Sequence, residues 1–469
     1  MYNNNIARGE RPVTHHDRMA KLSLKEKVGY AVGDFGFNLY WASIASFLAV
    51  FYTDVFGIPA AAAGTMFLVT KVVDAITDPI MGAVADRTKT RWGKFRPYLL
   101  FAGVPMAGAA VITFSTPDLN ESGKIIYAYI TYSFMMVMYT ILSTPYSSLS
   151  GVLTARSQDR TTLISFRFIA AFVGTALVNK FTLPLVEWLG QGNETLGWQL
   201  TMLLYGIIAA IVFAITFFST TERIAPPAGQ NTNPLNDIKD LLNNRPWVIL
   251  IVLAMIIMMT ITLRGGSGYY YFAYYVERPD LISNYLFVQG IALGVGAALT
   301  PLMTKFVDKT KLLMLLMGIV GVLSIGFYFV PRDAIGLMFT LNILISLALG
   351  PKSPLAWSMY ADSADYTEWK TGRRATGMTF SAATFAQKLG GALGSAFMLW
   401  MLAAIGYVAR EAQTDASQQG IALLQTVIPG VIAFIAAFVV SFYPLTTEKL
   451  EQIQTDLKAR EAEQPTAAN

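Results

Sequence analysis

The sequence predicts an all-α membrane protein with twelve transmembrane helices, arranged as two pseudo-symmetric six-helix bundles with both termini in the cytoplasm. The first observation is composition: 54% of the 469 residues are hydrophobic and 14% are charged, whereas a soluble chain usually carries about 25% charged residues. The second is that apolar runs of about 20 residues, the length that spans a bilayer, recur from end to end. The third is a short motif that recurs at the same place in both halves.

Polar segments divide the predicted spans six and six. We expect a cytoplasmic tail at 1–27, an N-terminal six-helix bundle at 28–219, a cytoplasmic middle loop at 220–245, a C-terminal six-helix bundle at 246–443 and a cytoplasmic tail at 444–469. The spans are expected at 28–53, 59–85, 98–115, 125–150, 162–188, 198–219, 246–275, 282–306, 312–331, 334–361, 376–406 and 420–443.

Lys and Arg set the orientation, because basic residues favour the cytoplasmic side of a membrane. They crowd the tails, the loop 87–96 and the middle loop, while the segments placed outside hold Lys124, Arg278, Arg332 and Arg410. The first tail lacks the apolar core of a cleavable signal peptide, so the first span is expected to direct insertion itself. Because the bases lie beside apolar spans, they indicate a membrane surface and not a nucleic-acid partner.

The two halves share a loop motif. The sequence Asp-(Arg/Lys)-Thr-Lys stands at 86–89 and again at 308–311, each time seven residues after a proline, Pro79 or Pro301. Both copies fall at the cytoplasmic end of the second span of their half. Two parallel six-helix halves with a repeated loop describe the major facilitator architecture, in which the halves rock about a central site. The loop 87–96 has a second interpretation as a membrane-surface anchor.

A charged helix face lies inside the second span. Asp74 and Asp78 are four residues apart and Lys71 is three before Asp74, so a helix places all three on one face. Charges at such depth are costly and normally face a bundle interior or a wet cavity. Two carboxylates offer hard oxygen ligands to a small cation, or a pair that accepts a proton. The alternative is a structural ion pair between helices.

Basic side chains inside the spans exceed the acidic ones. The acids are Asp34, Asp74 and Asp78, and the bases are Lys71, Arg167, Lys180, Arg264, Lys352 and Lys388. Because unpaired buried charge is costly, a wet cavity or an anionic ligand must complete the balance, which favours an acidic substrate. The tyrosines at 269–275 fit either a sugar-stacking surface or an interfacial aromatic belt.

Several function classes lack their signatures. The chain has no Cys, and its two histidines, His15 and His16, lie in the polar first tail. No Gly-x-Ser-x-Gly motif and no phosphate-binding loop is present, so neither an enzyme nor an ATP-driven pump is expected, and no cofactor is expected. A sensor or a lipid flippase on the same scaffold stays open, as do an exporter and an exchanger.

Five separated motifs resemble one family. They stand at 29–34 (GYAVGD), 51–54 (FYTD), 71–82 (KVVDAITDPIMG), 91–97 (RWGKFRP) and 362–374 (DSADYTEWKTGRR). The chain resembles the glycoside–pentoside–hexuronide:cation symporters, the melibiose permease family, from Leu22 to about Leu445. The resemblance implies a multi-pass protein of a bacterial inner membrane that imports a sugar with a coupling cation, without an obligate protein partner.

The resemblance also implies roles for individual residues. Asp74, Asp78 and Thr140 match the site for the coupling Na⁺, Li⁺ or H⁺, so Asp74 and Asp78 are the expected metal ligands if Na⁺ is used. Arg167 matches a sugar-site arginine and Lys388 a lysine near both sites. The match to charged positions of a cytoplasmic gate falls on Asp362, Asp365, Glu368 and Arg374.

Three positions depart from the melibiose permease pattern. Asn38 and Ser143 stand where that pattern has sugar-binding aspartates, and Ser147 stands where it has a tryptophan. Losing two carboxylates makes the expected cavity more positive, in line with Arg264 and Lys352. We therefore predict an acidic sugar such as a uronide, bound through Asn38, Ser143, Ser147, Arg167, Arg264, Lys352 and Lys388. A neutral xyloside or other pentoside stays the alternative.

Overall fold

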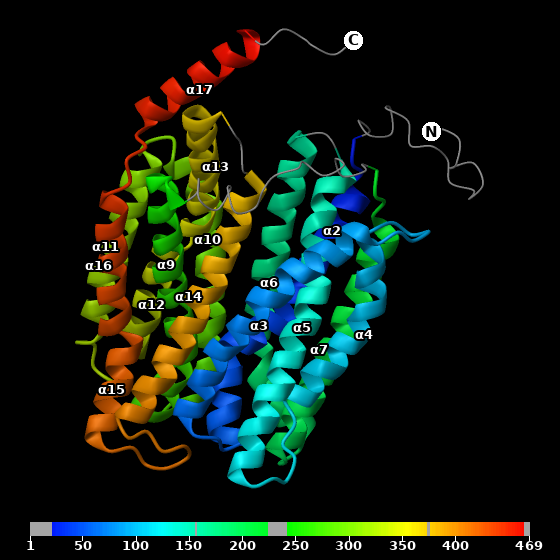
Figure 1. Ribbon diagram of the computed structural model, residues 1–469. Helices are drawn as coiled ribbons and strands as arrows, with labels where there is room; N and C mark the ends of the chain where they lie inside the picture. The colour runs from blue at the N-terminus through cyan, green and yellow to red at the C-terminus, as the bar shows by residue number, and fades with distance from the viewer. Residues whose placement is uncertain (1–20, 155–156, 224–241, 373–375, 464–469) are drawn as a thin grey trace. The chain divides into compact units, whose positions relative to one another are not determined.

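The computed structural model describes residues 21–154, 157–223, 242–372 and 376–463, and these fold into helices joined by short connections (Figure 1). The chain forms two compact units, residues 1–43 with 72–230 and residues 44–71 with 231–469, here called unit 1 and unit 2. Residues 44–71 belong to the expected N-terminal bundle by sequence, yet they group with the second half. The predicted domain boundaries stay a prediction.

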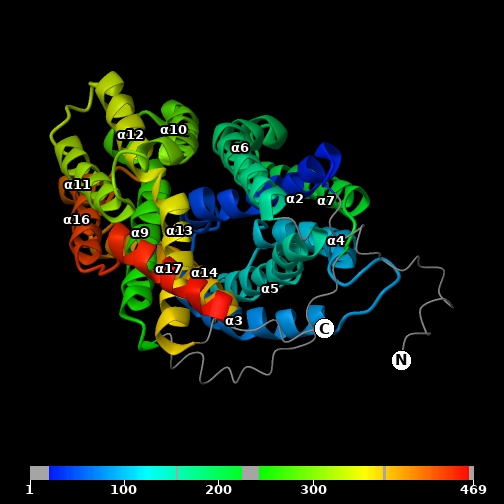
Figure 2. The same ribbon diagram turned by 90° about the horizontal axis from the view of Figure 1, so that it is seen from above.

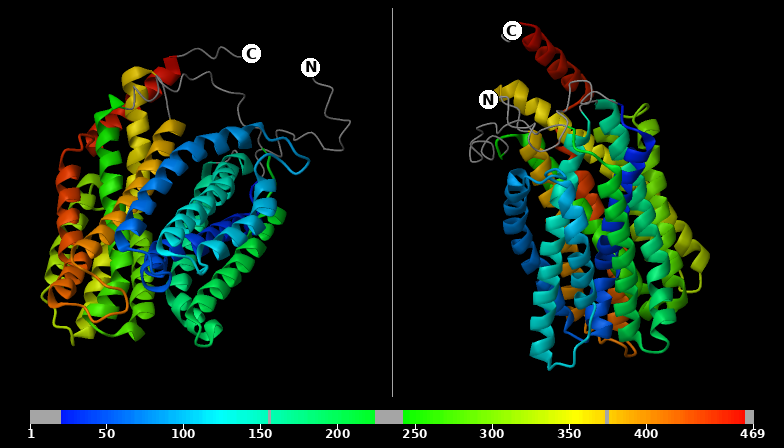
Figure 3. Two further views of the ribbon diagram at one scale, coloured as in Figure 1. Left: turned by 60° about the horizontal axis from the view of Figure 1, so that its bottom comes forward. Right: turned by 90° about the vertical axis from the view of Figure 1, so that its right-hand side faces the viewer.

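Unit 1 is a bundle in which α2 lies against α6 and α7, and α4 lies between α5 and α7 (Figure 3). Asparagine caps begin two of the helices: Asn120 Oδ1 accepts from the Gly123 amide at 2.8 Å, and Asn193 Oδ1 accepts from the Leu196 amide at 3.1 Å. The helices are α2 (Leu24–Ser43), the later part of α3 (Ala60–Arg87), α4 (Arg96–Thr113), α5 (Glu121–Leu153), α6 (Ser157–Gly190) and α7 (Glu194–Ser219).

Unit 2 packs α9 against α14 and α16, α11 against α16, and α10 against α12. Its elements are η2 (Ile44–Leu48), η3 (Phe51–Val55), the start of α3, α9 (Arg245–Tyr270), η4 (Tyr271–Tyr275), η5 (Pro279–Leu281), α10 (Ile282–Met303), α11 (Lys309–Phe327), α12 (Ile335–Leu349), α13 (Lys352–Thr371), α14 (Thr376–Ala404), α15 (Asp415–Gln425), α16 (Val427–Ser441) and α17 (Thr447–Glu463).

Ten helices within the described ranges are long and apolar enough to cross a membrane. They coincide with ten of the predicted spans. The other two predicted spans, 28–53 and 376–406, are also helical, the first as α2 followed by the π-helical turns η2 and η3 and the second as α14. The all-α architecture is thus confirmed, while the number twelve and the cytoplasmic termini stay predictions.

The start of α2 is tied to later segments of unit 1. Lys27 Nζ donates to Asp159 Oδ1 at 2.7 Å, and the Arg223 guanidinium pairs with Glu26. Burial opposes ionisation of Glu26, but hydrogen bonds from Ser23 and Arg223 outweigh it and hold the pKa of this carboxyl below its ordinary value. The stabilisation from Glu26 is therefore present at neutral pH and is lost as the pH falls through that lowered pKa.

The C-terminal tail includes α17, which lies across α13 (Figure 2). Trp369 Nε1 of α13 donates to Asp456 Oδ2 at 2.8 Å, and Lys449 Nζ lies 4.7 Å from the centre of the Trp369 ring. Both contacts join α17 to the Trp369 side chain of α13.

Close helix packing in unit 2 depends on a small residue. A Cβ atom at Gly390 of α14 would lie 2.4 Å from the Met255 carbonyl oxygen of α9, whereas a Cβ at Gly318 of α11 would meet no atom within 4 Å. In a membrane, glycine lets two helix backbones approach in this way.

We predict that Gly390→Ala weakens the α9–α14 contact, because the backbone of α9 must move away from the added methyl group. The expected cost is about 1–3 kcal/mol, seen as a lower midpoint of thermal unfolding for the purified protein in detergent. Gly318→Ala is the matched control and is expected to leave the midpoint unchanged or raise it slightly, since alanine favours helix more than glycine does. Equal midpoints for the two variants would contradict the prediction.

Candidate functional site

The predicted cation ligands lie in unit 1, on α3 and α5. Asp74 is fully buried and Asp78 is half-buried one turn later on α3. Thr140 of α5, itself buried, donates from Oγ1 to Asp78 Oδ1 at 2.8 Å. The fold therefore brings Thr140 to the α3 carboxylates across 62 positions of sequence, and the role of the three in binding a cation stays a prediction.

Backbone geometry adds to this cluster. Pro79 follows Asp78 directly inside α3 and has no N–H to donate to the carbonyl oxygen of Ala75. The Ala75 carbonyl oxygen therefore lacks the amide donor that a helix normally supplies. Among the described residues, no group of three or more His, Cys, Asp and Glu side chains is placed to hold a metal ion, so a cation here would depend on hydroxyl and carbonyl oxygens beside the carboxylates.

The predicted sugar contacts of unit 1 form a second cluster. Arg167 Nε of α6 donates to Asp34 Oδ1 of α2 at 3.0 Å, and its guanidinium lies 5.0 Å from the centre of the Tyr146 ring. Asn38 Nδ2 donates to the Asp34 carbonyl oxygen at 2.8 Å, and Thr175 Oγ1 donates to Asn38 Oδ1 at 3.1 Å. Arg167 and Asn38 therefore share Asp34 as a neighbour, a pairing that the sequence did not predict.

Ser143 and Ser147 continue the face of α5 that carries Thr140. They follow it by three and seven residues, a helical repeat that places all three on one side. Ser143 is half-buried and Ser147 is exposed. Their part in binding a sugar stays a prediction.

Arg264 is enclosed inside unit 2, with 1% of its surface exposed. Its guanidinium donates to Ser324 Oγ of α11 at 3.4 Å and to Asn342 Oδ1 of α12 at 3.1 Å. Asn342 in turn donates from Nδ2 to the Tyr285 carbonyl oxygen of α10 at 3.1 Å. These bonds join four helices, so in this conformation Arg264 holds the bundle together rather than facing a pocket.

Lys352 lines a small pocket in unit 2. Apolar residues of α9 form one wall, and Ser353, Tyr360 and Gln387 supply the other polar groups. Lys352 Nζ contacts the Met258 sulfur at 3.2 Å, and no acidic residue lines the pocket. Lys388 follows Gln387 on α14 and is half-buried.

The predicted gate residues lie on α13. Asp362, 8% exposed, accepts from Lys309 Nζ at 2.8 Å, and Lys309 belongs to the second copy of the repeated loop motif. Asp365 and Glu368 are half-buried on the following turns of α13. Arg374 lies outside the described residues.

A cluster around Asp54 in unit 2 was not among the predicted sites. Asp54 Oδ1 accepts from the Tyr407 hydroxyl at 2.7 Å, and Asp54 Oδ2 accepts from the Tyr274 hydroxyl. The neighbouring Thr53 and Tyr270 hydroxyls lie 3.0 Å apart. Of the two interpretations offered for the tyrosines at 269–275, neither anticipates that Tyr274 donates to a buried carboxylate. The sequence did hold one signal for this cluster, because Asp54 directly follows the first predicted apolar span, 28–53.

Comparison with known proteins places this geometry in a family. The sequence model of the family described as MFS/sugar transport protein matches residues 29–447. The inner membrane symporter YicJ of Escherichia coli (strain K12) is 37% identical, over 93% of this chain and 95% of its own length.

Two further relatives carry substrate names. The isoprimeverose transporter of Lactiplantibacillus pentosus is 34% identical, over 97% of this chain and 95% of its own length. A glucuronide carrier protein homolog of Escherichia coli (strain K12) is 31% identical, over 94% of this chain and 96% of its own length.

A solved structure matches the fold. A D-xylose-proton symporter superposes with a TM-score of 0.66 at 17% identity, covering 91% of this chain and 98% of that one. The fold is thus the all-helical major facilitator fold. From the family model and the relatives together, the chain belongs to the glycoside–pentoside–hexuronide symporters of the major facilitator superfamily, and it is a multi-pass protein of the bacterial inner membrane.

Proposed function

We propose that this protein is a secondary active symporter that imports an acidic sugar, such as a uronide, together with Na⁺ or H⁺ by alternating access. The observation that carries the proposal is the Asp74–Asp78–Thr140 cluster, in which a buried carboxylate, a second carboxylate and a hydroxyl meet inside a membrane helix bundle. Two further observations support the proposal. The chain belongs to a symporter family, and its sequence lacks the motifs of an enzyme or an ATP-driven pump. No resident cofactor is needed beyond the coupling cation.

The cation acts by removing negative charge. Na⁺ held by the two carboxylates and the Thr140 hydroxyl would remove the net negative charge of this site, and H⁺ on one carboxylate would do the same. Because ionised Asp in a bilayer interior is costly, the loaded and empty forms differ in which conformation they stabilise. The cation thereby shifts the balance between outward and inward states. Coupling of this kind is reciprocal, so the sugar must raise cation affinity by the same factor.

We predict that Asp74→Asn and Asp78→Asn each reduce gradient-driven sugar uptake about tenfold or more, because a charged hydrogen-bonding ligand is lost. Thr140→Val is expected to weaken the cation affinity by less. The measurement is uptake of labelled sugar into membrane vesicles under a Na⁺ gradient and, separately, under a pH gradient.

Asp280→Asn, which alters an exposed carboxylate paired with Arg278, is the matched control and is expected to transport normally. Dependence on Na⁺ identifies Na⁺ as the coupling ion, and dependence on the pH gradient identifies H⁺. Uptake that ignores both gradients, with Asp74→Asn fully active, would return the carboxylates to a structural role.

Lys352 supports an acidic substrate. Its ammonium lies in a pocket whose walls are mostly apolar and lack an acidic side chain, and a buried cation without a counter-charge is strongly destabilising. An anionic substituent of the substrate would supply that counter-charge, with Ser353 and Gln387 as hydrogen-bonding neighbours. The pocket is small, which suits one carboxylate better than a whole sugar ring. A relative named for a glucuronide carrier agrees with this choice.

We predict that Lys352→Met selectively impairs uptake of a glucuronide while leaving uptake of the glucoside with the same aglycone unchanged. Truncating one partner of a buried charge pair costs about 2–5 kcal/mol, which corresponds to a loss of about thirtyfold or more. Lys352→Arg keeps the charge and is expected to retain part of the glucuronide uptake. Equal loss for both sugars would assign Lys352 a structural role, and a wild type that transports only the glucoside would contradict an acidic substrate.

The runner-up function is symport of a neutral xyloside or other pentoside, which the similarity to an isoprimeverose transporter favours. The glucuronide and glucoside arms of the same experiment separate the two. A protein that binds these sugars without moving them across vesicles would be a sensor on the same scaffold.

A further inference from the structure

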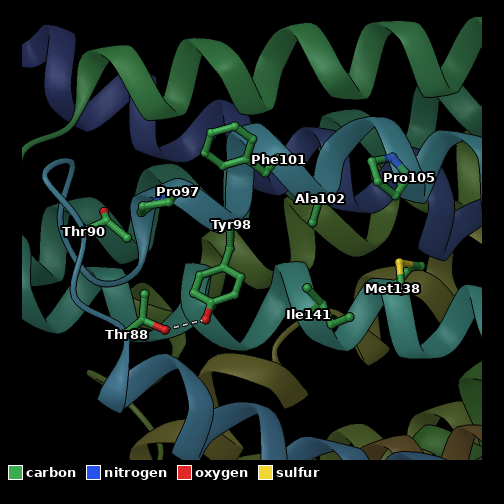
Figure 4. Close-up of a pocket in the computed structure, with 9 residues that line it drawn as sticks. All are labelled: Thr88, Thr90, Pro97, Tyr98, Phe101, Ala102, Pro105, Met138 and Ile141. Carbon is green, nitrogen blue, oxygen red and sulfur yellow. Dashed lines mark hydrogen bonds between the residues drawn. The ribbon is translucent and has the colours of Figure 1, made fainter.

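Unit 1 contains an apolar crevice of about 410 Å³ that the transport site does not use. Tyr98, Phe101, Ala102 and Pro105 of α4 form one side, and Met138 and Ile141 of α5 form the other (Figure 4). The Tyr98 hydroxyl lies 2.6 Å from Thr88 Oγ1, so its polar group is already hydrogen-bonded. The crevice therefore suits a hydrocarbon occupant.

The surface around the crevice faces hydrocarbon. Phe101 is 58% exposed, the neighbouring Val104 is 68% exposed, and Phe134 of α5 is 46% exposed. Large apolar side chains are stable in such positions when lipid chains surround them. An acyl chain thus reaches the crevice from the bilayer without crossing polar protein.

Basic residues are sequence neighbours of two residues that line the crevice. Thr88 and Thr90 line it, and the residues that alternate with them, Arg87, Lys89 and Arg91, are exposed. The Arg91 guanidinium lies 4.3 Å from the centre of the Trp92 ring, which lies 5.7 Å from the centre of the Phe101 ring. A continuous contact thus runs from a positive charge into the crevice wall.

The loop that carries these bases has a fixed shape. The Glu222 carboxylate accepts from the backbone amides of Lys94 and Phe95, both at 2.8 Å. Gly93, at a φ of +111°, leaves room for Glu222, because a Cβ there would lie 2.5 Å from a Glu222 oxygen. The backbone that follows the bases is therefore fixed before any ligand binds, which lowers the entropy cost of binding.

The second copy of the loop motif offers a contrast. In unit 2, Lys309 pairs with Asp362 at 2.8 Å and Lys311 with Asp308 at 3.4 Å. In unit 1, the described residues include no carboxylate paired with Lys89 or Arg91. Within the described part of the chain, Lys89 and Arg91 therefore differ from the paired lysines of the second copy.

We propose that this crevice binds an anionic phospholipid, with one acyl chain between α4 and α5 and the headgroup phosphate at Lys89 and Arg91. Charge complementarity selects an anionic lipid over a zwitterionic one. The loop belongs to the predicted cytoplasmic side, where anionic lipids attract basic segments. The lipid is a structural ligand, and its binding does not depend on which sugar is transported.

The test is lipid retention by the full-length protein, released from nanodiscs of equal phosphatidylglycerol and phosphatidylcholine with identical chains and examined by native mass spectrometry. We expect preferential retention of phosphatidylglycerol. Lys89→Gln and Arg91→Gln should each reduce that preference about fivefold, since each base near the surface contributes about 1 kcal/mol. Lys305→Gln, an exposed base beside the second loop, is the matched control and should change nothing.

Ala102→Trp tests the crevice itself. The indole fills the space between α4 and α5 while every base stays in place, so retention of both lipids at this site should fall. Equal retention of the two lipids by the wild type would overturn the proposal. So would phosphatidylglycerol retention that Ala102→Trp leaves intact, since the headgroup alone would then bind, or retention that both charge variants leave intact.

Discussion

The constraint behind this structure is the cost of placing charge and unpaired polar groups where water is scarce. Each half of the chain meets it by giving its buried ions close partners. Arg167 is held by Asp34, Arg264 by a serine and an amide, and Asp54 by tyrosine hydroxyls. Since apolar side chains lose little by moving between lipid and protein, these polar contacts specify which helices pack together.

The same constraint separates structural ions from those that await a ligand. Arg264 is enclosed and bonded to residues of two other helices, so removing it would disturb the bundle. Lys352 is bonded to a thioether in an open pocket, and a thioether is a weak acceptor. The Asp78–Thr140 contact lies between these cases, because a hydroxyl can turn its oxygen toward a cation that arrives. Incomplete pairing inside a membrane is thus the physical mark of the proposed substrate contact at Lys352.

Sequence predicted the fold well because a transmembrane helix is a local pattern, written in about 20 consecutive residues. The partnership of Asp78 with Thr140 came from family resemblance, as did the role of Arg167. What sequence missed depends on contacts between distant segments. No local sequence pattern shows that Arg264 is enclosed or that Tyr274 donates to Asp54. Nor does one show that residues 44–71 group with the second half. Charge counting did not separate a bridging arginine from a pocket lysine.

The two loop copies show how a repeat diverges. The first copy ends a helix, since α3 stops at Arg87, whereas the second begins one, since α11 starts at Lys309. Asp362 of α13 binds Lys309 of the second copy, at the position where the first copy has Arg87. Asp362 therefore ties Lys309 to α13, the helix that begins with Lys352. If the first copy keeps its charge for lipid, the two halves meet the bilayer with unequal polarity. An internal repeat of this kind keeps its residue types, while the partner of each basic residue assigns each half its own task.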